Sequence, residues 1–185
     1  DRAAMLDIPS LRARARNSRL TLRRYEFMRF ADRLANPTFL VDEWWAPDSV
    51  IDLGGRKMRV LATPGHTPTT VSLCDDRLHQ LFVGDFTYLG NLYAFLPGAS
   101  RSAYRNTTRT LLSTIDPATR IFTAHMANPP APVKAPVLEV ADLQSLQHAL
   151  TLIEQDRLPS TGFYPRSFPV RGELKFVTGW DWNNR

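Results

Sequence analysis

Apolar positions near the start of the chain recur every three or four residues, a spacing typical of one face of a helix. In residues 9–35 these positions include Phe27, Phe30 and Leu34. Pro37 follows them, and a proline disfavours helical backbone at the residue before it. The pattern therefore predicts a helix over residues 9–35.

From residue 38 onward, short runs of β-branched, aromatic and other apolar residues are separated by clusters of Gly, Pro and Asp. The runs are TFLV, SVIDL, KMRVLAT, TVSLCD and HQLFVGD. The Gly-Gly pair at 54–55 and the Asp-Asp-Arg sequence at 75–77 are typical of hairpin turns. We expect an antiparallel meander of strands over this region.

A helical spacing returns after residue 98, where Tyr104, Thr108, Leu111 and Ile115 lie three or four positions apart. It predicts a helix that is followed by a short strand in the run RIFTAHM. A second long helix is expected farther along the chain, over about residues 138–155.

The tail is irregular in pattern, with one late hairpin expected around Arg171-Gly172. Strands followed by alternating helices and strands favour a mixed α/β or α+β class over a helix bundle or an all-β barrel. A length of 185 residues suffices for one substantial hydrophobic core. We therefore expect a single domain over residues 1–185.

Charge is concentrated at one end of the chain. The net charge is +5 at pH 7, and seven arginines lie within residues 1–24. No interleaved aromatic residues and no known nucleic-acid-binding motif accompany them, so we interpret this run as a solvated helical face rather than a nucleic-acid site.

Cys74 is the only cysteine, which excludes an intramolecular disulfide and a thiolate metal cluster. No run approaches the roughly 18 apolar residues of a membrane helix, and no signal-peptide pattern is present. We expect a soluble protein without a membrane partner, with the cytoplasm the favoured location. A chain that opens on Asp1 rather than Met leaves room for a segment upstream.

Four histidines are candidates for chemistry. His148 lies off the apolar side of the second helix and His79 lies beside a turn, so both are interpreted as surface residues. His66 and His125 each follow directly on a predicted strand, and Asp85 ends another. Each of the three is more often structural when taken singly, but together they form the imidazole and carboxylate set that zinc prefers, with iron or manganese as alternatives.

Three short motifs carry a resemblance to a known family. TPGHT after a strand, LFVGD at 81–85 and a later strand that ends in TAHM resemble the metallo-β-lactamase superfamily. The resemblance implies an αββα sandwich with two zinc ions. In that family pattern His66 would bind the first metal, Asp85 would bridge both, and His125 would bind the second. The last histidine usually follows Gly in the family and here follows Ala124.

The family's His-x-His-x-Asp-His loop has no counterpart here, because residues 1–65 contain no histidine. Either the chain is the part of a longer protein that begins just after that loop, or it is a relative that has lost its metals. We favour the first explanation, an N-terminally truncated sandwich, because three matching ligand positions remain. On that expectation this chain alone binds metal weakly and is prone to form homo-oligomers.

The resemblance implies hydrolysis, by water activated between two metal ions, of a small-molecule ester, lactone, thioester or amide. The alternative from a different class is a metal-free, non-catalytic relative that binds a partner through its basic N-terminal face. A nuclease ranks last, because nuclease members carry an extra domain for which the chain between Asp85 and His125 leaves no room.

Aromatic residues follow the bridging position closely. Tyr88 and Tyr93 are candidate catalytic hydroxyls that could polarise a substrate carbonyl, and Phe95 is a candidate for the pocket wall; ordinary aromatic packing is an equal alternative. Arg101 and Arg105 are poorly placed for the helix dipole. Arg101 is therefore a candidate for binding a substrate carboxylate or phosphate, with exposure to solvent as the alternative.

Overall fold

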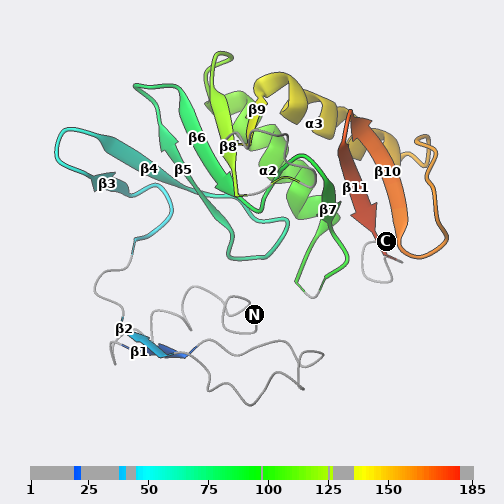
Figure 1. The fold of residues 1–185 in the computed structure, drawn as a ribbon, viewed down its shortest axis with the longest axis horizontal. Coiled ribbons are helices and arrows are strands. Elements are labelled where there is room, and N and C mark those ends of the chain that lie inside the picture. Colours follow the sequence, from blue (N-terminus) through cyan, green and yellow to red (C-terminus); the bar gives the residue numbers. More distant parts are fainter. Residues whose placement is uncertain are drawn as a thin grey trace.

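The computed structural model gives the protein a mixed architecture of sheets and two helices (Figure 1). Figure 1 draws the larger sheet on the left and the smaller sheet on the right, with helices α2 and α3 labelled toward the centre and top. The structure describes residues 19–21, 38–40, 45–96, 98–124, 126 and 136–179.

The larger sheet has six strands in the order β3-β4-β5-β6-β8-β9. Neighbouring strands from β3 to β6 pair antiparallel, which confirms the predicted meander. β8 then pairs parallel with β6, and β9 pairs antiparallel with β8. The strands are β3 (Val50–Asp52), β4 (Lys57–Ala62), β5 (Val71–Asp75), β6 (Gln80–Gly84), β8 (Arg120–Thr123) and β9 (Val137–Glu139).

The smaller sheet joins two distant parts of the chain, in the order β10-β11-β7. β10 (Arg166–Arg171) and β11 (Leu174–Thr178) form the hairpin predicted around Arg171-Gly172. β7 (Asn91–Tyr93) pairs parallel with β11 and was not predicted. The pairing brings the segment after β6 beside the end of the chain.

Two helices pack against each other, and the second also packs against β9 and β10. α2 (Arg101–Thr114) begins at Ser100, whose side-chain oxygen accepts a hydrogen bond from the Ala103 N–H at 3.2 Å. α3 (Val140–Glu154) begins with reciprocal side-chain and backbone hydrogen bonds between Glu139 and Asp142. Both caps satisfy backbone donors that a helix start otherwise leaves unpaired.

One hydrophobic core joins these elements, which confirms the predicted mixed class and is consistent with part of an αββα sandwich. Both helices present a buried side at the predicted spacing, so the core receives residues from every layer. Fully buried core side chains include Leu81 and Ile121 from the larger sheet, Tyr104 from α2, Leu146 from α3 and Phe176 from β11.

The helix predicted over residues 9–35 is wrong where the structure describes it. β1 (Arg19–Thr21) is a strand that pairs antiparallel with β2 (Thr38–Leu40), with Leu20 opposite Phe39. Local periodicity cannot detect a partner strand so far along the chain. The remainder of residues 9–35, with most of the arginine-rich segment, lies outside the described residues.

Among the residues that the structure describes, neither helix combines the length and the apolar character that crossing a membrane requires.

Candidate active site

Three strands of the larger sheet have their carboxyl ends at one edge. β4 and β6 both pair antiparallel with β5, so they run in the same direction, and β8 pairs parallel with β6. His66 lies in the turn after β4, and Asp85 follows β6 directly. Loops at the carboxyl ends of parallel strands are a common place for functional side chains to gather.

The turn that carries His66 is anchored to the start of α2 through its main chain. The Pro64 carbonyl accepts a hydrogen bond from Thr107 Oγ1 at 2.6 Å, and the Gly65 carbonyl accepts one from the Ser100 N–H at 2.9 Å. His66 itself is partly buried, and its Nδ1 atom is buried. The backbone just before His66 is therefore fixed relative to α2.

Gly65 permits a close approach between this turn and helix α2. A Cβ atom at this position would lie 2.8 Å from Cγ and 2.9 Å from Cδ1 of the Tyr104 ring. Its φ of 155° is also one that other residues rarely adopt. The ring of Tyr104 thus packs directly on the turn, and only glycine fits between them.

The turn that carries Asp85 is tied to the next parallel strand. The Gly84 carbonyl accepts a hydrogen bond from the Ala124 N–H at 3.1 Å, and the Phe86 N–H donates to the Val83 carbonyl at 3.0 Å. The β6–β8 register shifts just before this point, a feature that re-aims the end of a strand. Asp85 is exposed, whereas Phe86 beside it is fully buried.

Tyr104 contacts both turns. Its ring stacks on Phe86 at a centroid distance of 5.2 Å, meets Phe176 edge-on at 5.3 Å and packs against Gly65. Sequence reasoning placed Tyr104 only on the buried side of a helix. One feature of the sequence could have indicated a role beyond packing. The residue is a tyrosine, although Phe or Leu would fill a purely apolar position equally well.

The third predicted metal ligand, His125, lies outside the described residues. Over the part of the chain that the structure describes, His, Cys, Asp and Glu side chains form no group of three or more that could hold a metal ion. His66 and Asp85 supply one imidazole and one carboxylate from the same edge, and this donor chemistry suits zinc or iron. The predicted roles of the three residues stay predictions.

The two candidate tyrosines have different surroundings. Tyr88 is buried and its hydroxyl donates to the Asn91 carbonyl. Burial, with smaller contributions from the nearby Tyr93 and Asp85, raises the pKa of Tyr88 to about 12. Tyr93 is 36% exposed, and its oxygen accepts a hydrogen bond from the Asn91 side-chain amide at 3.3 Å. An accepting hydroxyl keeps its own proton for donation, so Tyr93 is the better placed donor.

The other candidates lie around the start of α2 and the end of β7. Phe95 is partly buried and meets Tyr93 edge-on at 5.8 Å, and it also lies 6.4 Å from the Tyr164 ring. Arg101 is the first residue of α2 and is partly buried. Arg105 forms an ion pair with Glu154 of α3, so its position after the helix start has a structural explanation.

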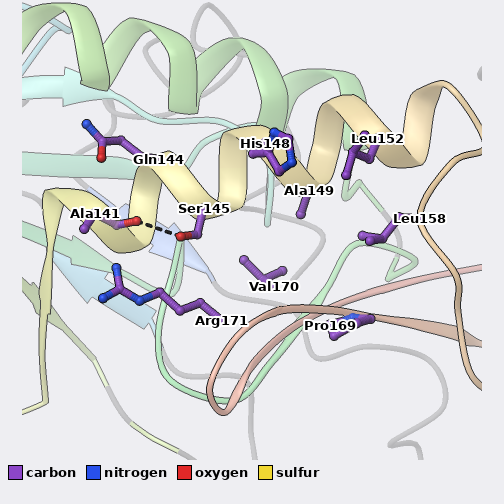
Figure 2. A pocket seen from close by; sticks show the side chains of 10 residues that line it. All are labelled: Ala141, Gln144, Ser145, His148, Ala149, Leu152, Leu158, Pro169, Val170 and Arg171. Carbon is purple, nitrogen blue, oxygen red and sulfur yellow. Dashed lines mark hydrogen bonds between the residues drawn. The ribbon is translucent and has the colours of Figure 1, made fainter.

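A separate hollow of about 420 Å³ lies between α3, the loop at Leu158 and β10 (Figure 2). Figure 2 shows a polar end with Arg171 and Ser145 and an apolar end with Leu152 and Leu158. The Ser145 hydroxyl donates a hydrogen bond to the Ala141 carbonyl at 2.9 Å. None of the predicted site residues lines this hollow.

Comparison with known proteins gives a family for the chain. The family model described as the metallo-beta-lactamase superfamily matches residues 7–125. The acyl-coenzyme A thioesterase MBLAC2 of Homo sapiens is 32% identical over 87 residues, which cover 47% of this chain and 30% of that protein. The match thus spans less than a third of the length of this curated relative.

Solved structures of this fold also resemble the chain. ETHE1 from Myxococcus xanthus has a TM-score of 0.48 and 20% identity, with 62% of this chain and 52% of that chain covered. TTHA1623 in a di-iron-bound form has a TM-score of 0.44 and 26% identity, with 63% and 52% covered.

Proposed function

This chain belongs to the metallo-β-lactamase superfamily, and we propose that it acts as a metal-dependent hydrolase of an acyl thioester or a related ester, lactone or amide. The superfamily consists mostly of hydrolases, and the human relative is a thioesterase. The observation that carries the proposal is the shared edge of β4, β6 and β8, where His66 and Asp85 follow two of the strands.

His66, Asp85 and His125 are the proposed metal ligands. Ala124, which precedes His125 in the chain, is hydrogen-bonded to Gly84, which precedes Asp85. That pairing supports a common site for the two positions. Superfamily members commonly bind zinc or iron, and we propose two zinc ions here, with iron or manganese as ions that the same donors accommodate.

Metal ions bound at this edge would supply Lewis-acid chemistry, polarising both water and the substrate carbonyl. The chain's own residues have the remaining tasks. Tyr93 would donate a hydrogen bond to the oxygen on which negative charge develops, because its proton is not engaged by Asn91. The Tyr88 hydroxyl donates a hydrogen bond to the carbonyl of Asn91, the first residue of β7. Tyr88 would therefore hold β7 in position rather than donate to the substrate.

The substrate side of the proposal uses Phe95 and Arg101. Three aromatic rings lie next to one another here. The ring centroid of Phe95 is 5.8 Å from that of Tyr93 and 6.4 Å from that of Tyr164. Together the rings offer apolar surface for an acyl group. Arg101 lies at the start of α2, close in sequence to Ser100, which is bonded to the His66 turn. A guanidinium there would suit a phosphate or carboxylate of the leaving thiol.

The test is an assay of thioester hydrolysis by the whole protein. The reaction is monitored through the free thiol that it releases. We expect activity that a chelator removes and that zinc or iron restores. His66→Ala should lose the activity and bound metal, whereas His148→Ala, an exposed histidine of α3, should keep both. Activity that survives both chelation and His66→Ala would overturn the proposal.

Absence of both metal and hydrolysis in the whole protein would instead favour the metal-free binding module. That alternative depends on the arginine-rich N-terminal segment, most of which lies outside the described residues.

A further inference from the structure

The ring of Tyr104 occupies the junction of the two turns that carry the proposed ligands. The His66 turn contacts it through Gly65, where even a methyl group would clash with the ring. The Asp85 turn contacts it through Phe86, with stacked rings at 5.2 Å. Phe176 meets the same ring edge-on, with the ring centroids 5.3 Å apart. One aromatic ring therefore contacts both turns.

The hydroxyl group of Tyr104 is not explained by packing. Tyr104 is fully buried, and its oxygen has no hydrogen-bond partner among the residues described. A buried donor without a partner destabilises a folded protein, and phenylalanine would fill the same space without that cost. A buried polar atom of this kind calls for a partner that the assembled site supplies.

The contacts of the ring indicate where that partner lies. Gly65 and Phe86, which both touch the ring, are the sequence neighbours of His66 and Asp85. The hydroxyl therefore belongs to the same junction as the two turns. Burial raises the pKa of Tyr104 far above its usual range, which favours the protonated hydroxyl, a hydrogen-bond donor.

We propose that Tyr104 is a positioning residue of the candidate metal site: its ring fixes the His66 and Asp85 turns at one separation, and its hydroxyl donates toward the Asp85 carboxylate. Because no direct hydrogen bond joins the two groups, the donation runs through one water, and it fixes the orientation in which the carboxylate meets a metal ion. This inference rests on the proposed function.

Tyr104→Phe separates the hydroxyl from the ring. If the hydroxyl were an unused buried group, its removal would leave metal binding unchanged and the protein at least as stable. We expect the urea midpoint to stay the same or rise, while affinity for Co²⁺ falls about 10- to 100-fold, the usual effect of losing a group that orients a metal ligand. The visible absorption spectrum of bound Co²⁺ should also change. His148→Ala, at an exposed histidine of α3, is the control and should leave the Co²⁺ affinity and spectrum unchanged.

Tyr104→Leu removes the ring. We expect faster hydrogen exchange at backbone amides of residues 63–70 and 84–87, in addition to weaker Co²⁺ binding. Circular dichroism checks that the variant is folded. Unchanged exchange in both turns would overturn the role of the ring, and wild-type Co²⁺ affinity and spectrum in Tyr104→Phe would overturn the role of the hydroxyl.

The outcomes also separate this inference from the proposed function. If the whole wild-type protein binds no Co²⁺, both fail together. If the wild type binds Co²⁺ and His66→Ala does not, but Tyr104→Phe binds as the wild type does, the assignment of the Tyr104 hydroxyl fails and the metal site stands.

Discussion

In the larger sheet, the turns at one end of the strands are held in place differently from the turns at the other end. Each of these two ends is called an edge below. At the edge of the β3–β4 and β5–β6 turns, charged side chains pair with one another. Arg56 contacts Asp75 at 2.6 Å, and Arg59 contacts both oxygens of Asp76, at 3.0 and 2.7 Å. The Leu78 N–H, together with Arg56, lowers the pKa of the buried Asp75 carboxyl. Charge at this edge supports the fold.

At the opposite edge, where β4, β6 and β8 end, main-chain hydrogen bonds and one aromatic ring hold the turns. The carbonyls of Pro64 and Gly65 bind α2, and Tyr104 packs against both turns. The comparison indicates that substitutions of charged residues should affect stability at the first edge and chemistry at the second.

Asp85→Ala should have the largest effect. We expect hydrolysis to fall by several orders of magnitude in the whole protein, because the substitution removes the proposed bridging ligand. The fold should be retained because Asp85 is exposed. The measurement combines kcat/KM, metal content and a urea unfolding curve.

Glu173→Ala removes an exposed carboxylate from the β10–β11 turn and should leave all three quantities unchanged. If Asp85→Ala keeps most of the activity, the contrast between the edges is lost and the hydrolase mechanism with it.

Tyr93→Phe should have the next largest effect on rate, about 10- to 1000-fold in kcat, if Tyr93 donates to the developing oxyanion. Tyr88→Phe should change the rate little and cost about 1 kcal/mol of stability, because the Asn91 carbonyl loses its donor. Steady-state kinetics and urea unfolding of both variants check this pair. The reverse pattern would make Tyr88 the donor.

Gly65→Ala should destabilise the protein by about 2–4 kcal/mol, because the new methyl group meets the Tyr104 ring at 2.8 Å and the backbone conformation is strained. Gly55→Ala is the control, since Gly55 has a positive φ of 93° but nothing within 4 Å of the added atom. It should cost about 1 kcal/mol. Equal costs in thermal or urea unfolding would show that the Tyr104 contact contributes nothing.

Asp75→Asn should have the smallest effect on chemistry, leaving metal binding and kcat unchanged while lowering the melting temperature by several degrees. The pKa of Asp75 is lowered in the folded state, so its contribution to stability is present above the unfolded pKa of about 3.9 and is lost as pH falls below it. The difference between wild type and variant should therefore shrink as the pH falls from about 3.9 through the lowered pKa of the folded state. A difference that grows in acid would contradict this sign.

The main elements could be predicted because local patterns encode them. Alternation and turn residues located the strands from β3 to β6, and helical spacing located α2 and α3. The elements that were missed or wrong depend on distant partners. β7 is a three-residue strand that exists through pairing with β11, and β1 forms a strand by pairing with β2, although its surroundings have helical spacing.

The candidate site was predictable only in part. His66 and Asp85 lie at one sheet edge, as their motifs and positions after strands suggested. Tyr104 was missed because its importance comes from contacts with Gly65 and Phe86, residues remote from it in sequence. The predicted place of His125 stays untested, because that residue lies outside the described part of the chain.

The role of His66 and Asp85 as metal ligands is tested by anomalous X-ray diffraction at the zinc absorption edge, from crystals of the whole protein grown with zinc. We expect an anomalous peak about 2.0–2.2 Å from an imidazole nitrogen of His66 or from a carboxylate oxygen of Asp85, with Asp85 contacting every ion in the site. Stoichiometric zinc whose peaks lie away from His66 and Asp85 would show that these residues do not form the metal site.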